Sequence, residues 1–457
     1  MKSRLSILRG ALAALALVAT IAWTGRADAQ QNIAGVLVDA EGVLKQNTVP
    51  GGAELNQKLA AAAKASLNKD VAKSSQLRMV SLTRLEKAIE EKIAAGQPVN
   101  DEMKYMAGLK HIKYVFFYPE SGDIVVAGPA EGWFTDNAGR VLSTESQEPT
   151  LHLEDLVTAL RAFPAGKKGN VMIGCSIDPT QEGLNRMQQF LAKTGRNLTD
   201  PNVTRFIVKG LKDSLGMQTI TVMGVPGSTH FAQVLVEADY RMKLIGIGLE
   251  EPAVKIPAYT DLVNPAQMAA NALQRWYFLP DYDSVKVSED NNAFELSGRG
   301  VKLLGEEEMV AQGGQRAVAG GINKASKTFT DTFTAKYPEL AAKSPVYAEL
   351  RNMIDLSIVA AFVQQQDFYG KADWKMSTLG DEKLFEVETY NIPAKVESAV
   401  NAIFKRNMLM TPIGGGVEIR AKQALATSNV KPDTDGSLAK ARDGVKLNLG
   451  KGQWWWD

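Results

Sequence analysis

The chain has 457 residues, of which 45% are hydrophobic and 23% are charged, and its formal net charge is +1. This composition is typical of folded globular proteins and argues against disorder over most of the length. No basic stripe or tail of like charge stands out, so nucleic-acid binding is not expected, because that function needs many lysine and arginine contacts to phosphates. With one cysteine and three histidines, we expect no disulfide, no metal site and no cofactor.

The N-terminal segment has the pattern of a secretory signal peptide. Three basic residues within positions 1–9 precede an uncharged run over 10–23, and Ala-Asp-Ala at 27–29 offers the small residues that signal peptidase recognises. The run is shorter than the ~20 residues that span a bilayer. We therefore expect cleavage after Ala29, no transmembrane span in the mature chain, and a periplasmic or extracellular location; the alternative is an uncleaved N-terminal anchor.

Cleavage would leave 428 residues with a formal charge of about −2, which predicts two or three domains. Residues 30–150 are predicted to form an N-terminal α+β region rich in hairpins, because short β-branched and aromatic runs alternate with turn residues. The predicted strands are 33–39, 77–82, 111–118, 124–127, 133–134 and 140–142, and the predicted helices are 53–67 and 83–95.

Residues 151–265 are predicted to form an α/β layer, because helical stretches alternate with short apolar runs. Helices of this length between strands favour βαβ units, whose strands are parallel. The predicted strands are 171–174, 219–223 and 244–247, and the predicted helices are 152–162, 179–193, 203–215 and 230–239.

Residues 266–425 are predicted to form a β-meander followed by a helical region. The predicted strands are 276–279, 285–287, 293–296, 301–304 and 417–419, and the predicted helices are 322–336, 345–366 and 394–405. The helix at 345–366 is apolar on most of its circumference, which predicts burial. The fold class is therefore mixed α/β (α+β): a central βαβ layer with antiparallel hairpins and a meander packed on buried helices.

Residues 426–457 are polar and glycine-bearing, and they are predicted to form a loose C-terminal tail. Three consecutive tryptophans at 454–456 would expose a large apolar area on such a tail. They are expected either to dock on the protein's own surface or to bind a partner or the membrane interface.

Two strand-to-helix junctions are the candidate site. One is Cys175 to Asp178 and the other is Gly224 to His230. If the preceding strands are parallel neighbours, both loops lie at the carboxyl edge of the sheet, where α/β proteins bind ligands. The candidate catalytic residues are Cys175, His230 and Asp178, and the candidate ligand-binding residues are Gly224, Gly227, Ser228 and Thr229.

Helix capping and packing explain the same residues and are the favoured interpretation. Asp178, Ser228 and Thr229 are common N-cap types, and Cys175 can fill space at a strand end. The glycine loop at 224–230 matches neither a phosphate-binding P-loop nor the G-x-S-x-G motif of serine hydrolases.

Three stretches resemble a known family: VPGSTHFAQVLVEADYRMKLIGIGLE at 225–250, RWYFLPDYDSVKVSEDNNAFELSGRGVKLLGEEE at 275–308, and KYPELAAKSPVYAELRNMIDLSIVAAF at 336–362. From about residue 77 to 416 the chain is similar to exported bacterial proteins, common in planctomycetes, that are known as a domain of unknown function. The resemblance implies one architecture over 77–416, exported as a unit. It implies no activity, ligand or catalytic residue.

The favoured functional hypothesis is an exported, non-catalytic binding or cell-envelope-associated protein with a protein or envelope partner. One alternative is a thiol-dependent hydrolase or transferase, with Cys175 as nucleophile, His230 as base, and Asp178 or Ser228 in support. Another is binding of an anion or small ligand at the Gly224–His230 loop, where helix N–H groups point outward.

Overall fold

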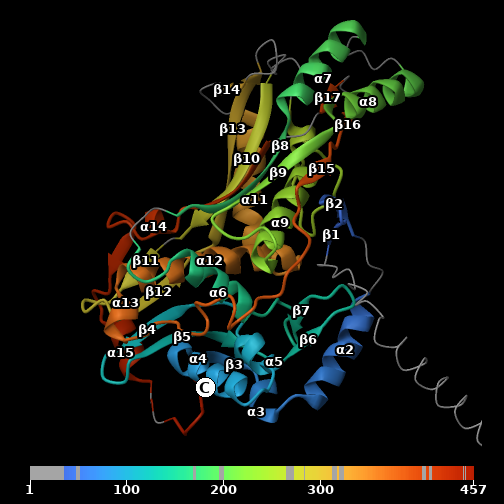
Figure 1. The fold of residues 1–457 in the computed structure, drawn as a ribbon. Coiled ribbons are helices and arrows are strands. Elements are labelled where there is room, and N and C mark those ends of the chain that lie inside the picture. Colours follow the sequence, from blue (N-terminus) through green and yellow to red (C-terminus); the bar gives the residue numbers. More distant parts are fainter. Residues whose placement is uncertain are drawn as a thin grey trace, which may run out of the picture. The chain divides into compact units, whose positions relative to one another are not determined.

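Two large β-sheets organise the chain (Figure 1). The structure is a computed structural model that describes residues 35–47, 52–167, 171–194, 200–263, 272–282, 284–310, 316–318, 324–403, 408–410, 414–445, 447 and 449–457. The predicted signal peptide lies outside these residues. Within the described parts, no helix combines the length and the hydropathy needed to cross a membrane.

The first sheet has nine described strands and mixes parallel with antiparallel pairs. Its order is β1 (Val36–Val38), β2 (Val43–Gln46), β15 (Lys395–Glu397), β9 (Met217–Met223), β8 (Ile173–Pro179), β18 (Gly414–Ile419), β10 (Ala272–Asp281), β13 (Gly300–Val310) and β14 (Arg316–Val318). The pairs β2–β15 and β10–β18 are parallel. Strands from the N-terminal, middle and C-terminal parts of the chain therefore share this sheet.

The second sheet has seven described strands. Its order is β19 (Val430–Pro432), β11 (Ser284–Val287), β12 (Ala293–Ser297), β4 (Tyr114–Tyr118), β5 (Asp123–Ala130), β3 (Ser75–Ser81) and β20 (Trp455–Trp456). The predicted hairpin at 111–127 is confirmed as β4–β5. Two further hairpins are β6 (Trp133–Thr135) with β7 (Val141–Ser143), and β16 (Asn401–Ile403) with β17 (Met408–Met410).

One hydrophobic core runs through both sheets and the helices beside them. The helices are α2 (Ala53–Ser66), α3 (Lys69–Ala72), α4 (Leu82–Ala94), α5 (Asp101–Lys104), α6 (Leu153–Ala162), α7 (Gln181–Thr194), α8 (Pro201–Leu215), α9 (His230–Gly246), α10 (Tyr259–Leu262), α11 (Lys324–Ala341), α12 (Pro345–Gln365), α13 (Phe368–Lys371), α14 (Ala421–Ala424) and α15 (Ser437–Asp443). α12 packs against α6 and α9 and is buried on almost every side, as its apolar circumference predicts.

The mixed α+β class is confirmed, but the prediction of a central βαβ layer with parallel strands is wrong. β8 and β9 are neighbours in the sheet and run antiparallel, with Gly174 opposite Met223 and Pro179 opposite Gln218. Two helices, α7 and α8, separate these strands and pack against each other around a small core of their own. A helical hairpin returns the chain to the end of the sheet that it left, whereas a single crossover helix would have made the strands parallel.

The predicted strand at 244–247 is also wrong, because α9 continues to Gly246. A short apolar run is ambiguous between a strand and a fully buried helix. The predicted helix at 394–405 falls largely on β15 and β16.

The predicted meander is divided between the two sheets. β10 and β13 pair with each other in the nine-stranded sheet, while β11 and β12 form a hairpin in the seven-stranded sheet. The chain therefore crosses from one sheet to the other after Asp281 and returns after Ser297. This crossing creates a junction between the sheets.

The predicted loose tail is wrong. Residues 426–457 contain β19, α15 and β20, and β20 pairs with β3 at the edge of the seven-stranded sheet. Trp454 and Trp456 are buried. The tryptophans dock on the chain itself, because burying their large apolar area against the core keeps it from water.

Candidate functional site

Cys175 is a buried residue in the middle of a sheet. Its side chain is 1% exposed, and its backbone lies between Val222 of β9 and Val417 of β18. Burial raises the pKa of the thiol well above its ordinary value, and the nearby carboxylate of Asp239 raises it further. A thiol in this environment is a poor nucleophile, because the thiolate is the reactive form.

His230 is the first residue of α9 and lies far along that helix from the thiol. Two of the charges that act on the Cys175 thiol belong to Asp239 and Lys243 of α9, and the Lys243 ammonium donates to the carbonyl of Ile177 at 2.9 Å. These two residues follow His230 by roughly 14 and 20 Å along the helix axis, from the rise of 1.5 Å per residue. The structure therefore does not bring Cys175 and His230 together as a nucleophile and its base.

The two predicted loops are also separated. Because β8 and β9 are antiparallel, Asp178 and the Gly224–His230 loop lie at opposite ends of their ladder. Asp178 is 3.4 Å from the Arg275 guanidinium, and Thr180 takes the N-cap role expected of Asp178 by accepting from the backbone N–H of Gly183. The convergence expected from parallel strands is thus wrong.

The glycine loop serves turning and capping. Gly224 has φ +79°, and a Cβ there would lie 2.4 Å from the carbonyl oxygen of Met172. Thr229 caps α9 by accepting from the N–H of Ala232 at 3.3 Å, as the capping interpretation predicts. The carbonyl of Ser228 accepts from the N–H of Tyr390, and that of Gly227 is approached by the side chain of Gln233.

A cluster that the sequence analysis missed lies where α6 and α9 begin. His152 and Glu154 come from the start of α6, and His230 comes from the start of α9. One ligand atom from each of the three side chains lies within 4.8 Å of the other two. The imidazoles of His152 and His230 stack with ring centroids 4.7 Å apart. The packing of α6 against α9 brings these residues together.

Carboxylates hold both imidazoles of this cluster. Nδ1 of His230 lies 2.9 Å from Oδ2 of the buried Asp155, and Nδ1 of His152 lies 3.5 Å from Oε1 of Glu154. Burial lowers the pKa of His230, but the charge of Asp155 and the hydrogen bond to it outweigh that effect and raise the pKa above its ordinary value. Burial raises the pKa of Glu154, while the hydrogen bond from His152 and the charges of both imidazoles lower it overall.

Two tyrosines flank the histidines. The ring of Tyr105 lies 5.3 Å from that of His152, and the ring of Tyr390 lies 6.2 Å from that of His230. Burial raises the pKa of Tyr105 to about 12 and raises that of Tyr390 as well, so both keep their phenolic protons at neutral pH. The cluster therefore combines two imidazoles, two carboxylates and two hydroxyl groups.

The sequence carries a weak signal for this cluster. The spacing His152-x-Glu154-Asp155 at a helix start places ligand-type side chains within one turn. His230 follows 78 positions later, and only the tertiary packing of α6 on α9 joins it to them.

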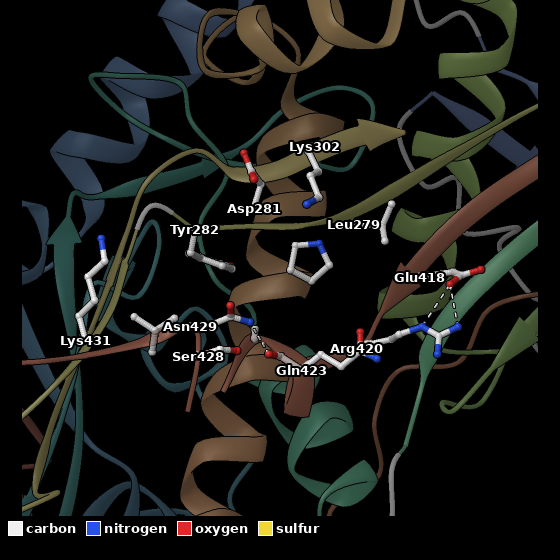
Figure 2. Close-up of a pocket in the computed structure, with 13 residues that line it drawn as sticks. Leu279, Asp281, Tyr282, Lys302, Glu418, Arg420, Gln423, Ser428, Asn429 and Lys431 are labelled. Carbon is white, nitrogen blue, oxygen red and sulfur yellow. Dashed lines mark hydrogen bonds and ion pairs between the residues drawn. The ribbon is translucent and has the colours of Figure 1, made fainter. Parts of the chain in front are cut away.

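A pocket of about 350 Å³ lies at the junction of the two sheets (Figure 2). Leu279 to Asp281 of β10, Lys302 of β13 and Glu418 of β18 come from the nine-stranded sheet. Val285 of β11 and Lys431 of β19 come from the seven-stranded sheet, and the segment at 423–429 supplies the remaining wall. The pocket forms where the chain crosses between the sheets.

The charged side chains that line this pocket differ in whether they form ion pairs. The carboxylate of Asp281 pairs with Arg299 at 2.9 Å, and that of Glu418 pairs with Arg420 at 3.1 Å. Lys302 is half-buried and forms no ion pair with any described residue. Figure 2 shows Lys302, Tyr282 and Arg420 arranged around the pocket. The lining therefore favours a negatively charged guest.

A buried carboxyl lies behind Tyr282. The Tyr282 hydroxyl donates to Asp355 of α12, whose side chain is 1% exposed. Burial raises the pKa of Asp355 to about 6, against the opposing effects of Arg351 and of this hydrogen bond. The hydroxyl of Tyr282 is thereby fixed at the edge of the pocket.

The fold and its sites define a mixed α+β protein with two sheets that share one core. Residues 175–259 match the family described as "Protein of unknown function (DUF1598)". The match runs from β8 into α10 and includes His230, but it begins after His152 and Glu154. No curated protein and no solved structure matches the chain.

Proposed function

We propose that this chain is an exported, non-catalytic binding protein of the periplasm or the extracellular space, and that the pocket at the sheet junction binds a small organic molecule with an acidic group. The secretory pattern of residues 1–29 supports export. The observation that carries the proposed binding function is the pocket itself, with Lys302, which forms no ion pair with any described residue.

The size and position of the pocket support this proposal. Ligand sites are concave, have volumes of roughly 300–1,000 Å³, and occur preferentially where structural units meet. The pocket has about 350 Å³ and is lined from both sheets. A small organic molecule of roughly ten non-hydrogen atoms is the size of guest that suits such a volume.

The lining chemistry supports an acidic guest. Leu279, Pro280 and Val285 offer an apolar wall, and Lys302, Arg420 and Lys431 bring positive charge. Because Arg299 holds Asp281 and Arg420 holds Glu418, these carboxylates repel an anion less than free ones would. A carboxylate or phosphate facing Lys302 gains a charge-assisted hydrogen bond.

The binding experiment is a calorimetric titration of the purified chain with benzoate, citrate and glycerol 3-phosphate. At least one should bind, and Lys302→Gln should weaken that binding by about tenfold or more, the size of one hydrogen bond to a charged group. Lys327→Gln is the matched control, because Lys327 is exposed on α11 and pairs with Asp331. Failure of all three anions to bind, or equal binding by both variants, would contradict the proposal.

Export is tested separately by expressing the full chain in a bacterial host and separating its compartments. The proposal expects the protein outside the cytoplasm, with a mature N-terminus at Gln30 in mass spectrometry. An uncleaved chain retained in the cytoplasm would contradict the proposed export. The proposed binding of an acidic molecule in the pocket would still be tested by the titration.

A further inference from the structure

We propose that His152, Glu154 and His230 form a binding site for a divalent transition-metal ion, with zinc as the best match to the donor set. This inference is independent of the sheet-junction pocket and of export. It rests on the convergence of three ligand-type side chains from two helices and on the way in which the surrounding groups orient them.

The donors have the right chemistry and nearly the right spacing. Zinc sites with an open coordination position use three protein ligands, often two histidines and one glutamate, at about 2.0–2.2 Å from the metal. Tetrahedral ligands at that distance lie about 3.3 Å apart. Nδ1 of His152 is 3.5 Å from Oε1 of Glu154, and all three ligand atoms lie within 4.8 Å of one another. Small side-chain rotations are enough to close the set around an ion.

Asp155 orients His230 as a metal-bound imidazole is usually oriented. A ligating histidine commonly donates its second ring N–H to a carboxylate, which fixes the tautomer and makes the free nitrogen more basic. Oδ2 of Asp155 lies 2.9 Å from Nδ1 of His230 and, as an acceptor, assigns the proton to Nδ1. Nε2 of His230 is then the lone-pair donor, and it makes no hydrogen bond to any residue that the structure describes.

A buried carboxylate oxygen of Asp155 also supports the proposed metal site. Oδ1 of Asp155 is enclosed and has no hydrogen-bond partner among the described residues. Such an atom carries a cost of desolvation that a bound cation nearby, or a metal-bound water, would offset. The second oxygen of Glu154 accepts from the backbone N–H of Glu388 at 3.2 Å, which holds that carboxylate in place and leaves Oε1 turned toward His152.

The surroundings favour a cation. Glu154 and Asp155 lie within the cluster, and Glu388 lies next to it. Arg140 is the cation that acts on His230, and its guanidinium is already bound by Glu237 and Glu349. Tyr105 and Tyr390 are neutral. The local excess of negative charge therefore attracts a divalent ion.

The chemistry of the donor atoms also determines which metal ions the site prefers. Two imidazoles and one carboxylate suit zinc, and they also bind cobalt and nickel, whereas calcium and magnesium prefer sites made of oxygen alone. Cys175 lies on β8 and takes no part, so no sulfur ligand is expected. Three protein ligands leave a fourth position for water or for an oxygen of a bound molecule.

The test uses the full purified chain, freed of metal with a chelator, in a competition titration with a zinc indicator. One zinc ion should bind per chain, and cobalt should bind at the same site with the visible absorption of a four- or five-coordinate ion. His152→Gln and Glu154→Gln should each weaken zinc binding by about 100-fold or more, and Asp155→Asn by about 10–100-fold. His111→Gln is the matched control, because His111 precedes β4 outside the cluster, and it should bind zinc as the unchanged chain does.

X-ray absorption spectroscopy of the unchanged, zinc-loaded chain keeps the proposal falsifiable if a variant does not fold. It should report two imidazoles with oxygen ligands and no sulfur. If carboxylates hold the two histidines for structural reasons alone, zinc will not bind in a stoichiometric amount. That result would overturn the proposal. A sulfur ligand, or zinc affinity unchanged in folded His152→Gln, would overturn it as well.

Discussion

The completely buried guanidinium of Arg78 forms a two-point ion pair with the side-chain carboxylate of Asp457, 379 positions further along the chain. Nε donates to Oδ1 at 2.8 Å, and Nη2 donates to Oδ2 at 3.0 Å. The same guanidinium also donates to the backbone carbonyls of Val71 and Ala107 and lies 4.7 Å from the ring of Trp455. Arg78 therefore ties the C-terminal segment to the seven-stranded sheet.

Replacing Arg78 should destabilise the fold strongly. Arg78→Met removes the ion pair and leaves buried carbonyls without donors, so we expect a loss of about 3 kcal/mol in the free energy of unfolding. Asp457→Asn should cost about 1 kcal/mol, because the carbonyl bonds remain. Urea unfolding followed by tryptophan fluorescence measures both. Glu54→Gln, in an exposed pair with Lys58, is the control and should change stability little; a similar loss in all three variants would contradict this role.

The thiol of Cys175 should be protected in the folded protein. Burial and a raised pKa both reduce thiolate formation, so reaction with iodoacetamide at neutral pH should be at least 100-fold slower than in urea. The measurement is mass spectrometry of the labelled chain over time. Rapid labelling under native conditions would restore the thiol-dependent enzyme as an explanation.

The buried ion-pair network around Glu237 of α9 is also expected to contribute strongly to the stability of the fold. Its side chain is fully buried and accepts from Arg140 at 2.7 Å and from Arg241 at 3.3 Å. Glu237→Gln removes the buried charge that both guanidinium groups share and leaves Arg140 with Glu349 and Arg241 with Glu250, so we expect a loss of about 3 kcal/mol in the free energy of unfolding. Glu339→Gln removes an exposed pair with Lys336 and should cost less than about 0.5 kcal/mol. Equal effects from the two changes would argue that the network contributes no net stability.

The stability contributed by Asp355 should depend on pH in a defined direction. Burial raises its folded-state pKa from the ordinary 3.8 to about 6, so the folded state holds the proton more tightly than the unfolded chain does. Its favourable contribution is therefore full below about pH 4 and is lost as the pH rises through about 6. Asp355→Asn removes this titration and keeps an acceptor for Tyr282. Relative to the unchanged chain, the variant should gain on the order of 3 kcal/mol between pH 4 and pH 7 in urea unfolding; a difference independent of pH would contradict the assignment.

Much of the secondary structure follows from local patterns. The helix that begins at Pro345 was predicted from its N-terminal proline and its apolar circumference, and the hairpin of β4 and β5 was predicted from its turn residues. The direction of β9 relative to β8 could not be predicted in the same way. It depends on whether α7 and α8 fold back on each other, and that packing is a tertiary contact.

The candidate sites show the same limit. Asp178 lies next to the Gly224 loop only if the strands are parallel, and the antiparallel pairing of β8 with β9 places Asp178 at the opposite end of the ladder. The His152–His230 pair depends on the contact between α6 and α9. Sequence patterns indicate which side chains can perform chemistry, while helix packing decides which of them meet.

The interleaving of distant segments has a consequence for how the chain acquires its structure. Val43 of β2 pairs with Lys395 of β15, and β3 obtains its second neighbour from Trp455 and Trp456. Such contacts close very long loops, which slows folding and leaves bare strand edges open to mispairing until late. We therefore expect a chain of this topology to expose unpaired strand edges until its distal half has been made, and we expect cleavage near residue 265 to yield aggregates in place of two autonomous halves.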